Sequence, residues 1–456
     1  MERMETWREA CLVPLERMKR VSDAMLHKMD VGLSETGTNL PMLPTYVTQQ
    51  PSGKETGHYF TLDLGGTNFR IAYIQLSEQV SKVELRREAK WNIPKENMEG
   101  TADGLFGLLA EAFKEFLEQL ESDGIPLNRD KIVLAFTFSF PMDQNALDSG
   151  KLLFWTKGFN IPSCVGKDVV VLLADAMHRS GIHGVVIPAV LNDTVGTLAA
   201  AQYFDETAKV GVIFGTGSNA AYVEEIEKIK KMRAKDYHSK HMVVDIEWSD
   251  FYTVELPIMS FDRKLDGESL HPGKATFEKM IGGMYIGEVA RNMLLELIGD
   301  NILPAPSPQG KIFLATNDVI GGEQVAAICA LQDVLGGELV ALTERLGYDD
   351  ETIKIAGPVI QEIMFLVSCR AARLAGAALY SVLRKTGRVG GVTTLPTVVA
   401  IDGSMFEHHH LFRKELCKSL AELVGPEAKN IKLQLSKDGS GLGAAIVAAV
   451  ADLGAQ

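Results

Sequence analysis

One segment predicts the architecture of the chain: Phe60-Thr-Leu-Asp-Leu-Gly-Gly-Thr-Asn-Phe-Arg-Ile-Ala-Tyr-Ile74, two apolar runs around a glycine turn. Apolar runs on both sides of such a turn are typical of a β-hairpin. A second segment of the same plan, Val210-Gly-Val-Ile-Phe-Gly-Thr-Gly-Ser-Asn-Ala-Ala-Tyr-Val223, begins about 150 residues later. The repeat predicts two related lobes that each present one glycine turn, so that a ligand between the lobes would be held from both sides.

The residues around the two hairpins alternate between strand and helix patterns. Leu105–Leu120 has helical apolar spacing, whereas residues 131–138 and Val185–Leu191 resemble buried strands. This alternation predicts an α/β fold. Further along the chain we expect helices over 195–203, 275–298 (broken at Gly282-Gly283) and 357–383, and strands over 398–401 and 431–435.

Length and composition narrow the class of protein. A chain of 456 residues exceeds what one hydrophobic core usually supports, which again favours two lobes around a cleft. The net charge of −13 disfavours nucleic acid and anionic membranes as partners. Five cysteines without a C-x-x-C pair predict free thiols in a reducing cytosol. No apolar signal segment opens the chain, and the longest apolar run, Leu442–Ala451, is about half of a membrane span, so we expect a cytoplasmic protein without a membrane anchor.

The two glycine turns are candidate phosphate-binding sites. Glycine lets the backbone approach a phosphate closely, and hydroxyl and amide donors follow in both turns at Thr67, Asn68, Thr216 and Ser218. A plain hairpin turn explains either segment equally well. Asp63 favours the phosphate site, because a carboxylate within an apolar strand is costly unless it meets a metal ion, a donor or water. We expect Asp63 to contact the Mg²⁺ of a nucleotide through water, and Arg70 to lie either nearby or on the surface.

Polar side chains set among apolar residues are candidate sugar ligands. Ser139 follows a predicted strand, and Thr156 and Lys157 lie between apolar residues. Glu247 and Glu278 are carboxylates with apolar neighbours. A sugar is bound by such combinations of donors and acceptors.

The pair Asn192-Asp193 follows the predicted strand that ends at Leu191. Ligands gather beyond the carboxyl ends of strands in α/β sheets, so Asp193 is a candidate general base. The same pair fits a helix N-cap, because helical spacing begins at Val195. Local sequence leaves both interpretations open.

Two late turns, Asp402-Gly-Ser404 and Asp438-Gly-Ser-Gly-Leu-Gly443, are candidates for binding a nucleoside and its phosphates, the second at a helix start. The second turn resembles a dinucleotide fingerprint, but too few residues follow it for the ribose-binding acid. His408-His409-His410 and the mixed charges of 224–240 are expected to be solvated loops.

Together these segments resemble the eukaryotic hexokinase family. The resemblance rests on LDLGGTNFR (62–70), FTFSFP (136–141), WTKGF (155–159), NDTVGT (192–197), FGTGSNAAY (214–222), IEW (246–248), FEKMIGGMYIGE (277–288), IDGS (401–404) and DGSGLGAA (438–445). Their order and spacing match the family from about residue 10 onward, over one catalytic unit of about 50 kDa.

The resemblance implies the actin-like, ribonuclease-H-like ATPase fold, with a large lobe of residues 1–59 and 193–437 and a small lobe of 60–192 and 438–456. It implies transfer of the γ-phosphoryl group of ATP, with Mg²⁺, to the 6-hydroxyl of glucose and of related hexoses such as fructose and mannose, the first step of glycolysis, by a monomer or homodimer. The rival interpretations are a hexose sensor and an actin-like ATPase without sugar kinase activity.

The resemblance also assigns roles to residues. The catalytic residues are Asp193, as general base, and Lys157. The sugar ligands are Ser139, Thr156, Lys157, Asn192, Asp193, Asn219, Glu247 and Glu278. The nucleotide ligands are Asp63, Gly65, Gly66, Thr67, Asn68, Arg70, Gly215, Thr216, Gly217, Asp402, Gly403, Ser404, Ser440 and Gly441.

The chain departs from the family pattern in four places. Ser218 stands where the family usually has Thr, and 249–252 replaces a Gly-containing loop. His408–His410 replaces the usual His-Pro, and 304–322 aligns poorly. These departures concern sugar preference and nucleotide affinity more than the type of reaction.

Overall fold

The computed structural model describes residues 2–66, 68–77, 82–232, 239–332, 336–391, 395–437 and 439–454. Thr67 and Asp438, one from each of two predicted phosphate-binding turns, lie outside the described residues.

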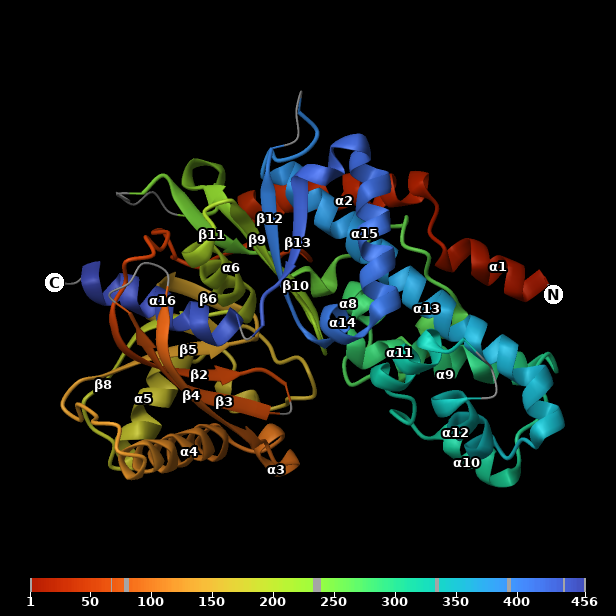
Figure 1. Ribbon diagram of the computed structural model, residues 1–456, viewed down its shortest axis with the longest axis horizontal. Coiled ribbons are helices and arrows are strands. Elements are labelled where there is room, and N and C mark those ends of the chain that lie inside the picture. Colours follow the sequence, from red (N-terminus) through yellow and green to blue (C-terminus); the bar gives the residue numbers. More distant parts are fainter. Residues whose placement is uncertain are drawn as a thin grey trace.

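A five-stranded sheet organises one half of the molecule (Figure 1). Its order is β4 (Val83–Asn92), β3 (Asn68–Leu76), β2 (Gly57–Leu64), β5 (Ile132–Phe138) and β8 (Val185–Leu191). The pairing of β2 with β3 is antiparallel, which confirms the first predicted hairpin, and β2, β5 and β8 run parallel. The helices α4 (Ala102–Ser122) and α5 (Val169–Arg179) pack on one face of this sheet and close an aromatic-rich core.

A six-stranded sheet organises the other half. Its order is β1 (Leu43–Pro44), β11 (His241–Asp245), β10 (Ser218–Glu225), β9 (Ala208–Phe214), β12 (Thr397–Asp402) and β13 (Ile431–Leu435). The antiparallel pairing of β9 with β10 confirms the second predicted hairpin. A two-stranded sheet, β6 (Met142–Ala146) with β7 (Ser149–Leu152), completes the strands.

Helices supply the rest of the larger core. The central one is α13 (Asp350–Lys385), which packs against α1 (Glu2–Cys11), α2 (Leu15–Ser34), α9 (Gly283–Gly299) and α15 (His410–Val424). Of the described helices, α13 is the one long and apolar enough to span a membrane, and 56% of its apolar window is buried here, as in the core helix of a globular fold. The remaining helices are α3 (Lys95–Met98), α7 (Ser260–Glu268), α8 (Thr276–Ile281), α10 (Pro308–Ala315), α11 (Gly322–Ala330), α12 (Gly337–Leu346) and α14 (Ser404–His408).

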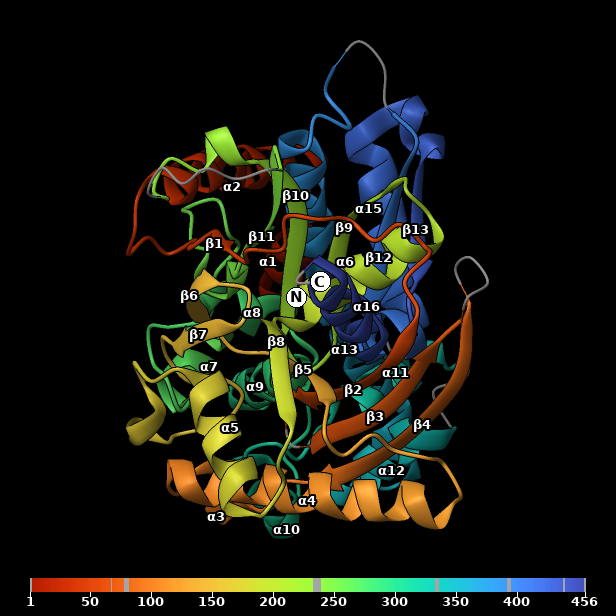
Figure 2. The same cartoon turned by 90° about the vertical axis from the view of Figure 1, so that its left-hand side faces the viewer.

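Two helices join the halves. α6 (Asp193–Phe204) packs on the six-stranded sheet, and α16 (Gly439–Gly454) packs on both α6 and the five-stranded sheet (Figure 2). The helices touch through glycine, since a Cβ on Gly443 would lie 1.7 Å from the carbonyl oxygen of Gly196. The core beneath them contains residues from both sheets. The predicted lobe boundaries at 59/60, 192/193 and 437/438 stay a prediction, but they coincide with the starts of β2, α6 and α16 to within three residues.

Three sequence expectations are wrong in detail. Glu224 is buried rather than solvated, because its carboxylate accepts a hydrogen bond from the Tyr222 hydroxyl (2.8 Å). His409 is buried rather than part of a solvated loop, with Nε2 2.9 Å from the Ser368 hydroxyl, and burial lowers its pKa to about 4. The long helix begins at Asp350, seven residues before the expected start, because Asp349 caps it and Pro358 is accommodated inside it. The break at Gly282-Gly283 is confirmed.

Candidate active site

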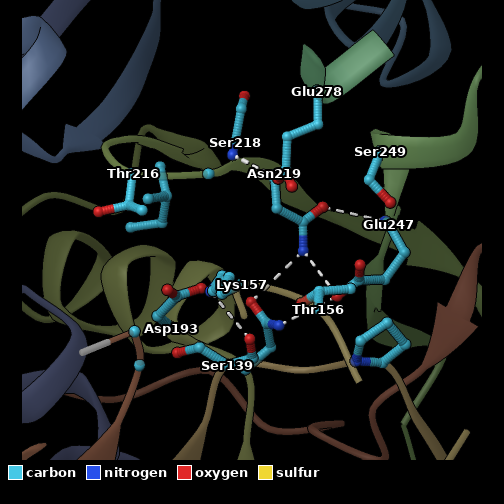
Figure 3. Close-up of a pocket in the computed structure, with 16 residues that line it drawn as sticks. Ser139, Thr156, Lys157, Asp193, Thr216, Ser218, Asn219, Glu247, Ser249 and Glu278 are labelled. Carbon is cyan, nitrogen blue, oxygen red and sulfur yellow. Dashed lines mark hydrogen bonds between the residues drawn. The ribbon is translucent and has the colours of Figure 1, made fainter. Parts of the chain in front are cut away.

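A cavity of about 190 Å³ lies where the two halves meet, and Figure 3 shows its lining side chains. Every residue predicted to bind the sugar lines it. The lining comprises Gly65, Gly66, Ser139, Pro141, Thr156, Lys157, Asn192, Asp193, Ile213, Thr216, Gly217, Ser218, Asn219, Glu247, Ser249 and Glu278.

One wall is the segment after β5 together with the loop that carries Thr156 and Lys157. The Lys157 ammonium donates to the carbonyl oxygen of Ser139 (2.9 Å), which ties the two segments together. Lys157 has a φ of 54°, a conformation that non-glycine residues adopt only when their surroundings hold them there. Aromatic rings around Trp155 hold this loop: the Trp155 ring meets Phe140 edge-to-face at a centroid distance of 4.8 Å and stacks on Phe159 at 5.1 Å. The loop is therefore a pre-formed part of the site.

Ser139 presents an unsatisfied hydroxyl to the cavity. The residue is 3% exposed, and its Oγ has no hydrogen-bond partner within the described part of the chain. A buried hydroxyl without a partner costs about 1–3 kcal/mol, and a ligand hydroxyl would remove this cost. The observation favours the predicted role of Ser139 as a sugar ligand.

The cap interpretation of Asn192-Asp193 is confirmed, while the role of Asp193 as general base stays a prediction. The Asn192 side chain caps α6 by accepting from the backbone N–H of Thr194 (3.0 Å). Asp193 is the first residue of α6, where the helix dipole favours a negative charge, and its carboxylate lines the cavity. The cap thus fixes the backbone from which Asp193 projects.

The far wall is a buried amide–carboxyl network. Asn219 Nδ2 donates to Asp245 Oδ1 (2.7 Å) and to Glu247 Oε1 (3.1 Å), and Asn192 Nδ2 also donates to Glu247 Oε1 (3.1 Å). Burial is the main reason that the pKa of Asp245 rises to about 7 and that the pKa of Glu247 rises well above its ordinary value. Glu247 also has a φ of 54°, so its backbone is held in a restricted conformation.

Glu278 approaches the second glycine turn closely. It projects from α8, and its Oε2 accepts from the backbone N–H of Ser218 (3.0 Å). A Cβ on Gly217 would lie 2.6 Å from that oxygen, so glycine leaves room for the contact without a shift of the Glu278 side chain. Burial raises the pKa of Glu278, while the Ser218 N–H and the Lys157 ammonium lower it.

A second cavity of about 530 Å³ adjoins the first. Asp193, Ser139, Gly65, Gly66, Ile213 and Thr216 line both cavities. The second is also lined by the predicted nucleotide ligands Asp63, Asn68, Arg70, Asp402, Gly403, Ser404 and Ser440. Asp193 therefore lies on the wall shared by the first and the second cavity, where it can contact a ligand in either one.

Hydrogen bonds link the predicted nucleotide turns to one another. The Ser440 hydroxyl donates to Asp63 Oδ2 (2.8 Å), and Asp402 Oδ2 accepts from the backbone N–H of Gly439 (3.1 Å). Burial, together with the nearby Asp193 carboxylate, raises the pKa of Asp63 to about 6. A cation close to the Asp63 carboxylate would therefore stabilise its ionised form.

The predicted nucleotide-binding glycines differ in position: Gly65, Gly66 and Gly403 line this cavity, Gly217 lines the first cavity, and Gly215 and Gly441 line neither. Gly403 has a φ of 110°, and a Cβ there would lie 2.4 Å from the carbonyl oxygen of Phe214. The backbone N–H of Gly215 donates to Gly217 O (3.0 Å) and so closes the second turn. Gly441 does not line the cavity; a Cβ there would face Thr61 at 3.7 Å, so its predicted contact with ATP is not seen in the lining.

Sequence reasoning missed several residues of the site. Asp245 was missed because a single acid at the end of the strand His241–Asp245 is no signal by itself; Glu247 lies beyond that strand with a φ of 54°, so strand alternation does not relate the two side chains. Lys90 and Lys437 line the second cavity and bring positive charge, but nothing in their local sequence distinguishes them from surface lysines. Only the fold brings them to the site.

Comparison with known proteins decides the family. Two family models described as hexokinase match residues 3–203 and 209–450. The chain belongs to the hexokinase family.

Individual relatives agree along the whole chain. Hexokinase-7 of Oryza sativa subsp. japonica is 40% identical over 450 residues, which is 97% of this chain and 95% of the relative. Hexokinase-1 of Spinacia oleracea is 38% identical, covering 96% of this chain and 88% of the relative. A hexokinase from Schistosoma mansoni, solved in complex with glucose, superposes with a TM-score of 0.82 at 30% identity over 98% of this chain and 99% of that chain. The predicted hexokinase-type α/β fold is confirmed.

Proposed function

We propose that this hexokinase transfers the γ-phosphoryl group of ATP to the 6-hydroxyl of glucose and of related hexoses such as fructose and mannose. The observation that carries the proposal is the position of Asp193 on the wall shared by the two cavities. A general base in phosphoryl transfer has to touch both the attacking hydroxyl and the space that the phosphoryl group enters.

The hexose occupies the first cavity. Its hydroxyls are bound by the unsatisfied Ser139 hydroxyl, by the Thr156 and Asn192 side chains, and by the carboxyls of Glu247 and Glu278. The glucose complex of the Schistosoma relative supports glucose as the first candidate. The aromatic support of the 155–159 loop and the fixed carboxyl positions pre-organise this site, which lowers the entropic cost of sugar binding.

ATP occupies the second cavity. The glycine turns let the phosphates approach the backbone, Asp402 to Ser404 border the nucleoside, and Arg70 and Lys437 bring positive charge. Among the described residues, no group of three or more His, Cys, Asp or Glu side chains is arranged to hold a metal ion. Mg²⁺ would arrive on ATP and would be held by one protein carboxylate, Asp63, through water, because Mg²⁺ keeps several waters and binds phosphates readily. Bound Mg²⁺ would neutralise charge on the phosphates.

Asp193 takes the proton of the 6-hydroxyl as that oxygen attacks the γ-phosphorus. The Lys157 ammonium, which is held by Ser139, lies on the same cavity wall and offsets negative charge that develops during transfer. The protein forms no covalent bond, so positioning and charge stabilisation account for the rate.

Lobe closure protects the reaction from water. A wider cleft of about 870 Å³ adjoins the sugar cavity at Thr156, Lys157 and Glu278, and it is bordered by Met98 and Phe154 on one side and by Leu270 and Tyr285 on the other. Because these borders come from different predicted lobes, closure on the bound hexose would narrow the cleft and exclude water, which competes with the sugar as nucleophile. The cytoplasmic location and the monomeric or homodimeric state stay predictions.

The first experiment replaces Asp193. In Asp193→Asn, kcat should fall by at least ~10²-fold, the order expected for loss of a general base, while the hexose Kd changes by less than about tenfold. Asp175→Asn, an exposed position on α5, is the matched control and should retain wild-type kcat. Wild-type turnover in Asp193→Asn would remove Asp193 from the role of base.

A further inference from the structure

Asp245 is a buried carboxyl that lies behind the sugar cavity. It is the last residue of β11 and is 4% exposed, yet it is not among the residues that line the cavity. Its strand neighbours, Leu43 of β1 and Ala221 of β10, are uncharged. A carboxyl is rarely buried without a specific partner, so its contacts indicate what it does.

The contacts of Asp245 lead to Glu247. Asn219 Nδ2 donates to Asp245 Oδ1 at 2.7 Å and to Glu247 Oε1 at 3.1 Å, so one amide group holds both carboxyls. The orientation of this amide is fixed, because Asn219 Oδ1 accepts from the backbone N–H of Glu247 (2.9 Å) and of Ala220 (2.7 Å). Glu247 Oε1 also accepts from Asn192, which leaves Oε2 for a ligand in the cavity.

The two carboxyls are also electrostatically linked. In addition to burial, the negative charge of Asp245 raises the pKa of Glu247, while the hydrogen bond from Asn219 lowers the pKa of Asp245 against the larger effect of burial. The other charged groups that face the pair are Asp193 at the start of α6, which raises both pKa values, and Lys157, which lowers the pKa of Glu247. Thr194, the remaining neighbour, is neutral and 3.5 Å from Asp245.

We propose that Asp245 is a positioning residue for hexose binding, which holds the Glu247 carboxyl in its orientation toward the sugar through the Asn219 amide that both carboxyls share. The inference rests on the proposed function, since it assigns Glu247 to the sugar. Ionised Asp245 accepts from the Asn219 amide, and its negative charge favours a protonated Glu247, whose O–H can then donate to a sugar hydroxyl. When Asp245 is itself protonated, it loses its charge and accepts from the Asn219 amide less well, so the network holds Glu247 less firmly.

The consequence is a pH-dependent sugar affinity. Because the pKa of Asp245 is raised to about 7, the fraction of protein with ionised Asp245 falls as the pH is lowered from 8 to 6. If only that form binds well, the hexose Kd rises by about tenfold across this interval. A residue that merely stabilises the fold would not produce this dependence.

The test measures glucose binding without nucleotide by tryptophan fluorescence, since Trp155 lines the wider cleft beside the sugar cavity and Trp248 Nε1 donates to the Ser218 hydroxyl (3.0 Å) at the cavity wall. Wild type, Asp245→Asn, Glu247→Gln and the exposed control Asp123→Asn are compared from pH 6 to 8. The expected result is a Kd that rises about tenfold toward pH 6 in wild type and in Asp123→Asn, and that stays within about twofold in Asp245→Asn and Glu247→Gln.

Two results would overturn the inference: a flat wild-type Kd between pH 6 and 8, or a profile in Asp245→Asn that equals the wild-type profile. The first needs no variant and holds whether or not Asp245→Asn folds; thermal unfolding of each variant checks folding. Failure of the proposed function is distinguishable, because wild type would then show no glucose binding or no glucose-dependent ADP release at any pH.

Discussion

The contact between Gly217 and Glu278 offers a sharp test of the sugar site. Alanine at position 217 would place a Cβ 2.6 Å from Glu278 Oε2 and 3.4 Å from Lys157 Cε, with the backbone outside the left-handed region. The carboxylate must therefore retreat by more than half an ångström to reach a normal contact. The retreat breaks the hydrogen bond from the Ser218 N–H.

The lost bond sets the scale of the effect, because the hexose would have to bring the displaced Glu278 carboxylate back to its binding position against the added Cβ. A hydrogen bond to a charged group contributes about 1.5–3 kcal/mol, which corresponds to about a 10- to 150-fold change in affinity. We expect Gly217→Ala to raise the hexose Kd by this factor in tryptophan fluorescence titrations. Gly107→Ala in α4, where an added Cβ meets nothing within 4 Å, is the matched control. A hexose Kd in Gly217→Ala within twofold of wild type would refute the assignment of Glu278 to the sugar.

Two further predictions concern the nucleotide cavity. Gly403→Ala should raise the KM for Mg·ATP at least about tenfold, because the Cβ would lie 2.4 Å from the carbonyl oxygen of Phe214. Gly124→Ala is the control for backbone strain, since Gly124 also has a positive φ but an added Cβ there meets nothing within 4 Å. An equal KM in the two variants would contradict the role of the clash. Ser440→Ala removes a hydrogen bond that lowers the pKa of Asp63, so the acid limb of the pH–kcat profile should move up by about 0.5 to 1 in pH; an unmoved limb would show that Asp63 ionisation does not limit turnover.

Much of the fold was predictable because its signals are local. Both hairpins and the strand over Val185–Leu191 are where apolar runs and glycine turns place them. The start of α13 was not predictable from sequence, because Pro358 and the polar first turn are typical of a helix boundary. The Asp349 cap and tertiary packing nevertheless extend the helix to Asp350. The sheet order and the crossing of α6 with α16 depend on contacts distant in sequence, which only the family resemblance supplied.

The residues of the site also differ in how far local sequence predicts them. Asp193 and Asn192 were predictable from their place after a strand, although only the structure shows that Asn192 is the cap and that Asp193 faces two cavities. Glu224 and His409 look solvated in sequence because their neighbours are charged or polar, yet tertiary partners bury both. Asp245 was overlooked because a lone acid at a strand end has no meaning until Asn219 is placed beside it.

If the two cavities form one active site for phosphoryl transfer to a hexose, ADP release from ATP depends on the sugar. The most direct test is a coupled assay of ADP release from Mg·ATP with glucose, fructose, mannose or no sugar, with the product identified. We expect sugar-dependent ADP release, with glucose among the substrates and a hexose 6-phosphate as product. ADP release that does not depend on sugar, or glucose binding without any ADP release, would contradict it.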